Sequence, residues 1–370
     1  MIALPLLLAL ACTDKDTPAE DSGAPVDSAP EFYPPDAAGP YPVGTASGEA
    51  PGPDGLTLEV QVWYPATAAG AETYAYMGLI SGLATADTTP DCSQTRPVVL
   101  FSHGNAGINF QSIFFTEYLA SHGYVVVAPM HTYNTAFDDD ESRKWEVVFR
   151  RPLDISASYD WLLTENAEGG AYAGCVDPDA GYVMSGHSFG GYTTFAVAGA
   201  PIDLDAVAAF CDEQGGGWLC DDVATWGEAH PETRIADLSD SRVTAAIAMS
   251  PAGYEALVGG LDQIDVPFEI LTGGQDNLTP MYYVKPLYNA LVTTPRHIGE
   301  LEGAGHYTFS DACLFSSSFD DCGEDYLSAE EAHPLINAAA MAFLQISAGD
   351  DRAADYLPPA SELWTWESVQ

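Results

Sequence analysis

Three polar residues that are far apart in the sequence have the side-chain types and the settings for nucleophilic catalysis, and the first is Ser188. It lies in Gly186-His187-Ser188-Phe189-Gly190, which fits the pattern G-x-S-x-G directly after an apolar, strand-like run. In this context the pattern predicts a sharp strand-to-helix turn that raises the Ser188 hydroxyl above the edge of a sheet. Gly186 and Gly190 are the small flanks that such a crowded turn needs, so Ser188 is the candidate nucleophile.

A serine hydroxyl is a poor nucleophile until a base accepts its proton, and the candidate base among the eight histidines is His306. It follows the last expected strand, and small residues before it let the loop bend back toward Ser188. Asp276 is the only acid in Gly273-Gly274-Gln275-Asp276-Asn277, directly after the preceding strand. We expect Asp276 to orient His306 and to stabilise its imidazolium. The rival carboxylates are less well placed: Asp265, Glu300, Glu302 and Asp311.

The segment Ser102-His103-Gly104-Asn105 follows another expected strand and is the candidate oxyanion loop. Gly104 lets the chain turn so that a backbone N–H faces the Ser188 turn. We expect the N–H groups of Asn105 and Phe189 to hold the negative charge of a tetrahedral intermediate, and one such donor contributes about 3 kcal/mol of transition-state stabilisation. His103 is interpreted as a structural residue that braces this loop.

A fold must bring these candidate residues together. From about Tyr41 onward, apolar β-branched runs alternate with helical segments. The alternation predicts an α/β fold with a doubly wound, mostly parallel sheet and helices on both faces. Strands are expected at residues 56–64, 97–102, 124–128, 182–185, 243–249, 268–272 and 297–301, and helices at about 111–121, 154–163, 190–199 and 334–345. The catalytic domain then spans residues 41–346, with an insertion at 203–240 as a candidate cap. A tail follows at 347–370.

The composition is strongly acidic, with 11 basic and 54 acidic side chains and a formal net charge of −43. Such a protein would repel DNA and RNA, which excludes nucleic acid as a partner. No calcium-binding loop of the type D-x-[DN]-x-[DN]-G is present. Four basic residues cluster within nine positions and either contact a substrate anion or pair with nearby acids, and we favour the pairing. They are Arg143, Lys144, Arg150 and Arg151.

The first residues are typical of an export signal. Met1–Ala11 is almost wholly apolar and much shorter than the roughly 20 residues that span a bilayer. Leu8-Ala9-Leu10-Ala11-Cys12 is similar to a bacterial lipobox, in which the cysteine is lipidated; the alternative is an ordinary signal peptide with an incidental cysteine. Residues 13–40 are rich in Pro, Asp and Glu and predict a disordered tether. We therefore expect an exported protein that a lipid on Cys12 anchors to a bacterial cell envelope, and otherwise a periplasmic or secreted one.

Taken together, these motifs resemble the α/β-hydrolase superfamily. The residues that carry the resemblance are His103-Gly104, Gly186 to Gly191, Asp276 and Gly305-His306, and the order Ser188, Asp276, His306 is the order of that superfamily. Over residues 41–346 the chain is most similar to bacterial dienelactone-hydrolase-like esterases related to platelet-activating factor acetylhydrolase. The resemblance implies hydrolysis of carboxylic esters without metal or cofactor, on substrates with short acyl groups or on acetylated phospholipid-like esters. We also expect a monomer. Dienelactone hydrolases use a Cys nucleophile where this chain has Ser188.

Two alternatives to this function stay open. Polyester hydrolases, cutinases and lipases share the same core, but Met249-Ser250-Pro251 is followed by Ala252 instead of the Trp that is usual in polyester hydrolases. The other alternative is a catalytically inactive α/β-hydrolase that serves as a binding module. It is disfavoured because Ser188, Asp276 and His306 fill all three positions.

Six cysteines remain when Cys12 is set aside, and an exported protein is expected to oxidise them. Cys211 and Cys220 flank three glycines, and Cys313 and Cys322 flank a short loop after His306, so each pair is expected to form a disulfide. The remaining pair is Cys92 with Cys175. Both precede strands that are neighbours in the α/β-hydrolase sheet, at the edge away from the active site. The alternative is a set of reduced, buried thiols.

Overall fold

A nine-stranded sheet forms the frame of the residues that the computed structural model describes, which are 32–315, 318–357 and 361–369. The order across the sheet is β1-β2-β4-β3-β5-β8-β9-β10-β11. The neighbouring pairs from β4 to β10 are parallel, whereas β1, β2 and β11 run antiparallel to their neighbours. The strands are β1 (Val43–Pro51), β2 (Thr57–Pro65), β3 (Val98–Ser102), β4 (Val125–Pro129), β5 (Tyr182–His187), β8 (Val243–Met249), β9 (Phe268–Gly273), β10 (Arg296–Leu301) and β11 (Trp364–Val369).

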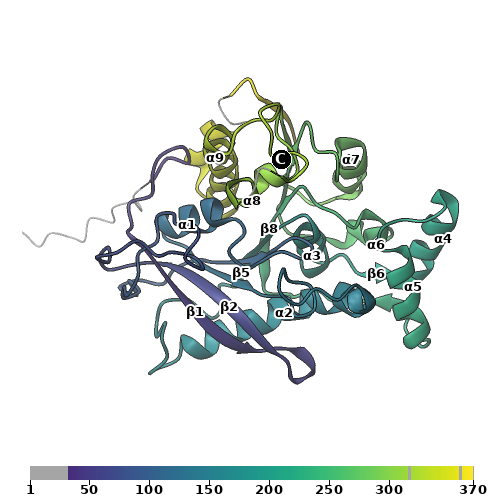
Figure 1. The fold of residues 1–370 in the computed structure, drawn as a ribbon, viewed down its shortest axis with the longest axis horizontal. Helices are drawn as coiled ribbons and strands as arrows, with labels where there is room; N and C mark the ends of the chain where they lie inside the picture. Colours follow the sequence, from purple (N-terminus) through teal and green to yellow (C-terminus); the bar gives the residue numbers. More distant parts are fainter. Residues whose placement is uncertain (1–31, 316–317, 358–360, 370) are drawn as a thin grey trace, which may run out of the picture. The chain divides into compact units, whose positions relative to one another are not determined.

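The central strands are continuous apolar runs because helices cover both of their faces. In β3, Val98 and Leu100 join one buried cluster, while Val99 and Phe101 join the other. The first cluster contains side chains of α2 (Lys144–Glu165), α3 (Phe189–Val197) and α7 (Met281–Ala290), and the second contains those of α1 (Ile113–Ser121) and α9 (Ala329–Ser347). Figure 1 shows α1 and α9 together, apart from α2 and α3. This is the mostly parallel α/β-hydrolase fold that the sequence predicts.

Helix α2 differs from the prediction, because it begins at Lys144 and not near Asp154. The helix passes through Pro152, and its first turns carry several charged residues. Pro152 is a residue that usually ends or kinks a helix, and Trp, Val and Phe at positions 145 and 147–149 have lower helix propensity than Ala or Leu, so local propensity gives little sign of this half. Val147 and Val148 are fully buried there, and their packing against the sheet stabilises the extra turns.

The insertion at 203–240 folds into two helices. They are α4 (Leu204–Gln214) and α5 (Cys220–Ala229), and a short antiparallel pair of strands, β6 (Ile202–Asp203) and β7 (Ile235–Ala236), closes its base. Asp203 begins α4 as an N-cap, because its carboxylate accepts hydrogen bonds from the N–H groups of Asp205 and Ala206. Figure 1 shows α4 and α5 at one end of the fold, away from α1 and α9.

The two ends of the described chain pack against the sheet and its helices. β11 lies at the sheet edge beside β10, and Trp364 is buried there. Residues from Tyr33 onward belong to the main unit, although the sequence assigns residues up to 40 to the tether. For example, Gln345 Nε2 donates a hydrogen bond of 2.8 Å to the carbonyl oxygen of Tyr33. The predicted signal, Cys12 and most of the tether lie outside the described residues.

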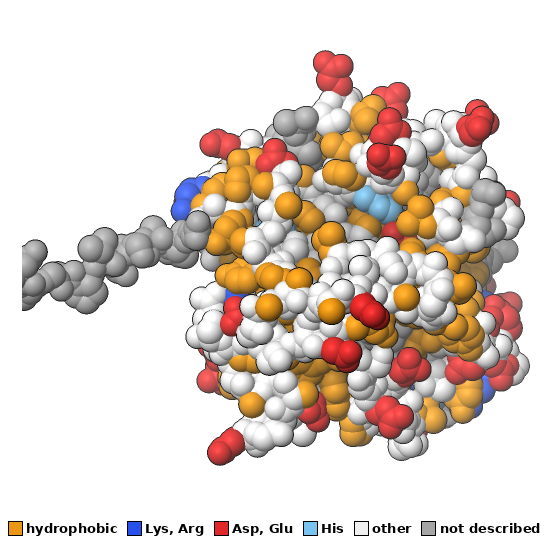
Figure 2. All heavy atoms as spheres, turned by 60° about the vertical axis from the view of Figure 1, so that its left-hand side comes forward, with side chains coloured by type: hydrophobic (Ala, Val, Ile, Leu, Met, Phe, Trp, Pro, Cys, Tyr) orange, Lys and Arg blue, Asp and Glu red, His pale blue; other side chains and the backbone are white. Residues whose placement is uncertain are grey.

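On the face that Figure 2 presents, the acidic side chains do not form one patch. Carboxylates are scattered there among apolar and neutral groups, and basic side chains are few. Within the described part of the chain, no helix is long and apolar enough to cross a membrane.

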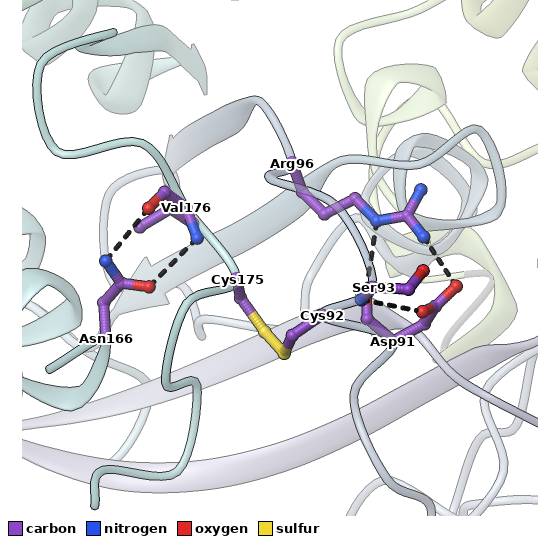
Figure 3. Close-up of a disulfide and its surroundings, with 7 residues drawn as sticks. All are labelled: Asp91, Cys92, Ser93, Arg96, Asn166, Cys175 and Val176. Carbon is purple, nitrogen blue, oxygen red and sulfur yellow. Dashed lines mark hydrogen bonds and ion pairs between the residues drawn. A yellow bond between two sulfur atoms is a disulfide. The ribbon is translucent and has the colours of Figure 1, made fainter. Parts of the chain in front are cut away.

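The three expected disulfides are present. They join Cys92 to Cys175, Cys211 to Cys220 and Cys313 to Cys322, with Cα–Cα distances of 4.3, 5.9 and 5.1 Å. Figure 3 shows the first of them, which links the segment before β3 to the segment before β5. Hydrogen bonds hold both segments beside the disulfide, because Arg96 bonds to Asp91 and the Asn166 amide bonds to the backbone of Val176. Disulfides of this kind favour an exported protein.

Candidate active site

Ser188 occupies a strained turn between β5 and α3. Its backbone has φ 59° and ψ −117°, a conformation that is costly for a residue with a Cβ. The flanking glycines allow this turn. A Cβ on Gly186 would lie 2.3 Å from the carbonyl oxygen of Gly190, and one on Gly190 would lie 1.9 Å from that of Ser102. The predicted small flanks are therefore required by the close approach of β3, β5 and α3.

His306 lies between Ser188 and Asp276. Its Nε2 is 2.9 Å from Ser188 Oγ, and its Nδ1 is 2.9 Å from Asp276 Oδ2. Asp276 follows β9 and His306 follows β10, so the carboxyl ends of three parallel strands bring the three side chains together. His306 and Asp276 are each only 3% exposed. The three residues that the sequence selects thus form one continuous hydrogen-bonded chain.

Asp276 is held in its ionised form. Burial by itself would raise the pKa of this carboxyl, but hydrogen bonds and the neighbouring imidazole of His306 lower the pKa to about 2. The carboxylate also accepts hydrogen bonds from the N–H groups of Leu278 and Thr279 and from the Thr279 hydroxyl, at 2.7–2.9 Å. Because an ionised carboxylate only accepts, the proton between the two residues is on Nδ1 of His306, which leaves Nε2 to accept from Ser188.

The candidate oxyanion loop lies beside Ser188. A Cβ on Gly104 would be 3.4 Å from the Ser188 Cβ, so the loop backbone passes close to the nucleophile. The Gly104 N–H donates to Gln111 Oε1 at 2.9 Å. Among the described residues, the N–H groups of Asn105 and Phe189 have no hydrogen-bond acceptor. We expect these two N–H groups, from their places in the sequence, to hold the oxyanion.

Gln111 and His187 connect this loop to the loop of His306, a link that the sequence did not reveal. Gln111 Nε2 donates to His187 Nδ1 at 2.9 Å, and His187 Nε2 donates to the carbonyl oxygen of His306 at 3.0 Å. Burial, followed by the repulsion of His306, lowers the pKa of His187 to about 3, so His187 stays neutral and can accept from Gln111. No local motif marks Gln111, which is why sequence spacing could not find it.

A cluster of buried polar side chains around Arg151 forms hydrogen bonds to the candidate oxyanion loop. Arg151, which is fully buried, donates hydrogen bonds to Asn134, Thr193, Ser102 and the carbonyl oxygen of His103. Asn134 Nδ2 in turn donates to Asn105 Oδ1 at 2.8 Å. Arg151 therefore acts on the loop both directly and through Asn134.

The same cluster contains a second Ser-His-Asp arrangement. Ser102 Oγ is 2.9 Å from His131 Nε2, and His131 Nδ1 is 2.9 Å from Asp154 Oδ2. All three residues are fully buried, so no ester carbonyl can reach Ser102. The backbone N–H of His131 also donates to Nε2 of the His103 ring. The Nδ1–H of the same ring donates to the Gly104 carbonyl oxygen. His103 thus braces the oxyanion loop, as the sequence predicts.

The other residues of the basic cluster pair with acids near them. Arg143 forms an ion pair with Glu146, and Lys144 lies 3.3 Å from Glu141 and 3.4 Å from Asp222. Arg150 Nη1 is 4.0 Å from Glu146 Oε2, and Arg150 also donates to the carbonyl oxygen of Thr132. In the described structure none of the four basic residues lines the cavity above Ser188. These contacts favour the pairing interpretation over a substrate contact.

Ser188 and His306 open into a cavity of about 1040 Å³. The oxyanion loop, the insertion, the segment after Asp276 and the segment after His306 all contribute to its lining. Much of that lining is aromatic: Trp218, Tyr254, Tyr282, Tyr307, Phe315 and Phe319. In the described part of the chain, no group of three or more His, Cys, Asp or Glu side chains is arranged to hold a metal ion.

One family model matches this chain, over residues 86–209, and its description is Chlorophyllase. The matched segment contains the oxyanion loop and the Ser188 turn but ends before Asp276 and His306. Over this segment the chain is similar to a family of ester hydrolases. The similarity supports an α/β-hydrolase-type esterase, and it does not single out the dienelactone-hydrolase-like or acetylhydrolase-like relatives. A search of the curated proteins finds no match.

Proposed function

We propose that the protein is a serine hydrolase of carboxylic esters, with Ser188 as nucleophile, His306 as general base and Asp276 as its orienting carboxylate. The observation that carries the proposal is the hydrogen-bonded chain from Ser188 through His306 to Asp276, which faces a large apolar cavity. Two N–H groups without acceptors among the described residues lie beside it, where charge develops in acyl transfer.

The proposed reaction has two halves. In the first, His306 Nε2 takes the proton of Ser188 as Oγ attacks the ester carbonyl, and the N–H groups of Asn105 and Phe189 hold the resulting oxyanion. His306 then gives this proton to the leaving alcohol, and an acyl-enzyme remains. In the second half, His306 removes a proton from water, which attacks the acyl-enzyme, and Ser188 leaves with the proton as the acid is released. Asp276 stays ionised throughout.

The substrate is proposed to be an ester with a short acyl group, as the family resemblance of the sequence implies. A cavity of about 1040 Å³ exceeds the space that a short acyl group fills, so it also has room for a large apolar alcohol group. An acetylated, phospholipid-like ester meets both conditions. Ala252 lines the cavity where polyester hydrolases carry an aromatic clamp, so the lining does not favour a polymer substrate.

Reaction with a fluorophosphonate probe tests the proposal. The Ser188 oxygen displaces fluoride and forms a bond to phosphorus only if His306 activates it, so the wild-type protein is labelled and the Ser188→Ala variant is not. Hydrolysis of p-nitrophenyl acetate is expected to follow the same pattern. A folded wild-type protein that neither reacts with the probe nor hydrolyses esters would instead be the inactive binding module.

We also propose that the mature protein is exported and anchored by a lipid on Cys12, with membrane contact only through that anchor. The three disulfides support export. The mass of the mature N-terminal peptide tests the anchor. An acylated Cys12 is expected, and the Cys12→Ser variant should be released from the membrane fraction. An unmodified peptide that begins elsewhere would contradict it.

A further inference from the structure

The insertion contributes an aromatic wall to the cavity above Ser188. We call residues 211–220 the acyl-side loop; they comprise the last turn of α4, the connection 215–219 and the first residue of α5. Trp218 is the largest of their side chains that line the cavity. Trp218 is 40% exposed, although a large apolar side chain is usually covered. Its position in a cavity wall explains this exposure, because a bound apolar group would cover the ring.

Several contacts fix this loop, although three glycines precede Trp218. Gly215 and Gly216 have φ values of +76° and +123°, so the chain turns sharply there. The disulfide between Cys211 and Cys220 closes the turn. The Leu219 N–H donates to Glu255 Oε1 at 2.7 Å, and the other oxygen of this buried carboxylate accepts from the Tyr283 hydroxyl. A glycine-rich segment by itself would leave Trp218 free to move.

The Trp218 ring stands directly beside the nucleophile turn. Its centroid is 4.9 Å from that of Phe189, the residue after Ser188, in an edge-to-face arrangement. Lys144 Nζ lies 5.3 Å from the same ring and has carboxylates of its own nearby. Trp218 is therefore held at both its backbone and its ring.

The chemistry of ester hydrolysis indicates which part of the ester, the acyl group or the alcohol group, lies against the wall that Trp218 forms. The leaving alcohol oxygen must lie near His306 Nε2, because that nitrogen protonates it. Tyr307 follows His306, and its ring packs against that of Phe319 at 4.7 Å, so these two residues mark the alcohol side. With the alcohol on that side, the acyl chain extends away from the leaving oxygen, toward the opposite wall, where Trp218 contacts Phe189.

We propose that Trp218, held by the acyl-side loop, is the residue that determines acyl-chain specificity. Its ring ends the acyl side of the cavity and restricts the enzyme to short acyl groups, while the space beside Phe319 takes an apolar alcohol group. The proposal rests on the esterase function proposed above and assigns the two halves of the substrate to two walls of the same site.

The test compares rates on p-nitrophenyl esters whose acyl groups range from acetate to palmitate. For the wild-type protein, kcat/KM is expected to fall as the chain lengthens beyond a few carbons. Trp218→Ala should raise the ratio of dodecanoate to acetate hydrolysis at least tenfold, because the chain then extends past the removed ring. The double variant Cys211→Ser, Cys220→Ser should shift the ratio in the same direction by a smaller factor, since the loop loses its closure.

Two matched controls separate this role from a general loss of packing. Phe319→Ala removes an aromatic ring of similar exposure, 39%, on the alcohol side. It should keep the acyl profile of the wild type and change the ranking of acetates with short and long alcohols. The double variant Cys92→Ser, Cys175→Ser removes a disulfide away from the cavity and should change neither profile.

The outcomes distinguish the two proposals. If the wild-type protein is not labelled by the fluorophosphonate probe and hydrolyses no ester, the proposed function fails. If it is labelled and active but Trp218→Ala keeps the wild-type acyl profile, the specificity inference fails and the function stands. A Phe319→Ala variant that shifts the acyl profile as much as Trp218→Ala would also overturn the inference. Thermal melting of each variant verifies that it is folded.

Discussion

At the scale of single residues, the ionisation of Asp276 is the feature with the most direct consequence. This carboxylate is buried, and its hydrogen bonds hold its pKa at about 2, below the value of 3.8 for a free side chain. A pKa that is lower in the folded protein means that the ionised group stabilises the fold at every pH above about 4. The same interactions keep the proton of His306 on Nδ1.

We expect the Asp276→Asn variant to lose about 10⁴-fold in kcat while it keeps its fold, because an amide does not fix the tautomer of His306. The pH dependence of stability should change as well. As the pH falls from 4 to 2, the wild type should lose about 2 kcal/mol of unfolding free energy more than the variant, since only the wild type must protonate Asp276. Urea denaturation at several pH values measures this difference. Parallel curves for the two proteins would contradict the pKa shift.

Asn134 is the second residue whose role can be separated from simple packing. It accepts from Arg151 at 2.6 Å and donates to the side chain of Asn105 at 2.8 Å, so it connects the buried cluster to a proposed oxyanion donor. Asn134→Ala should lower kcat about tenfold, or about 1.4 kcal/mol, with little change in KM, because the oxyanion forms only in the transition state.

Thr193→Val is the matched control for this prediction. It removes another hydrogen bond of Arg151, at 3.1 Å, and a bond within α3 to the carbonyl oxygen of Phe189, but it leaves the segment 102–105 untouched. Its kcat should therefore remain close to that of the wild type, with at most a loss of stability. Steady-state kinetics on p-nitrophenyl acetate decides between the two variants. An increase in KM alone for Asn134→Ala would show that Asn134 acts on substrate binding and not on the oxyanion.

At the scale of elements, the three disulfides differ in the length of chain that each closes and in the segments that each joins. The bond between Cys92 and Cys175 closes a sequence separation of 83 residues and joins the segments before β3 and β5. The other two each close a separation of 9 residues beside the cavity. Because the entropy lost by the unfolded chain grows with loop length, the long loop should contribute more to stability.

We expect the Cys92→Ser, Cys175→Ser variant to lose about 4.5 kcal/mol of unfolding free energy and each short-loop variant about 2.6 kcal/mol. Guanidinium denaturation of the three double variants gives this ranking, and non-reducing peptide mapping establishes the pairing in the exported protein. A peptide that links Cys92 to Cys211 or to Cys313 would refute the pairing. A short-loop variant less stable than the long-loop variant would refute the entropic argument.

At the scale of the whole molecule, the net charge of −43 is the property with the largest expected effect on how stability depends on salt. Few basic groups compensate it, so carboxylates repel one another across the surface, and this repulsion opposes the compact state. Salt screens such repulsion, with a Debye length of about 30 Å at 0.01 M and about 10 Å at 0.1 M ionic strength. The folded state gains from the screening more than the expanded unfolded chain does.

The melting temperature should therefore rise when sodium chloride is increased from 0.01 to 0.3 M. The expected rise is roughly 1–2 °C for each kcal/mol of repulsion that is relieved, because the unfolding entropy of a domain this large is high. Differential scanning calorimetry at fixed pH measures it, and an equal osmolality of sucrose is the control for effects other than screening. A constant or falling melting temperature would show that the surface charges are already compensated.

The candidate nucleophile and the central strands could be predicted from the sequence because each is marked by residues that lie close together in the chain. Ser188 is recognisable from Gly186 and Gly190, since a turn this tight accepts only small residues two positions before and after the nucleophile. The central strands are recognisable as largely apolar runs, because strands buried on both faces favour apolar side chains. Asp276 and His306 then follow from their places after successive strands. The half of α2 before Pro152 escaped prediction because tertiary packing overrides its poor local propensity.

Only the tertiary structure placed the residues that act across long separations. Gln111 bonds to His187, Arg151 to the carbonyl of His103, and Trp218 packs on Phe189, yet no spacing in the sequence relates the members of these pairs. A hydrogen bond or ring contact of this kind depends on how several elements pack at once, and many polar or aromatic side chains would suit each position equally well before folding. The sequence by itself therefore determined the candidate nucleophile, base and carboxylate, whereas the packing of the insertion and of α2 decided the shape of the cavity and the support of the oxyanion loop.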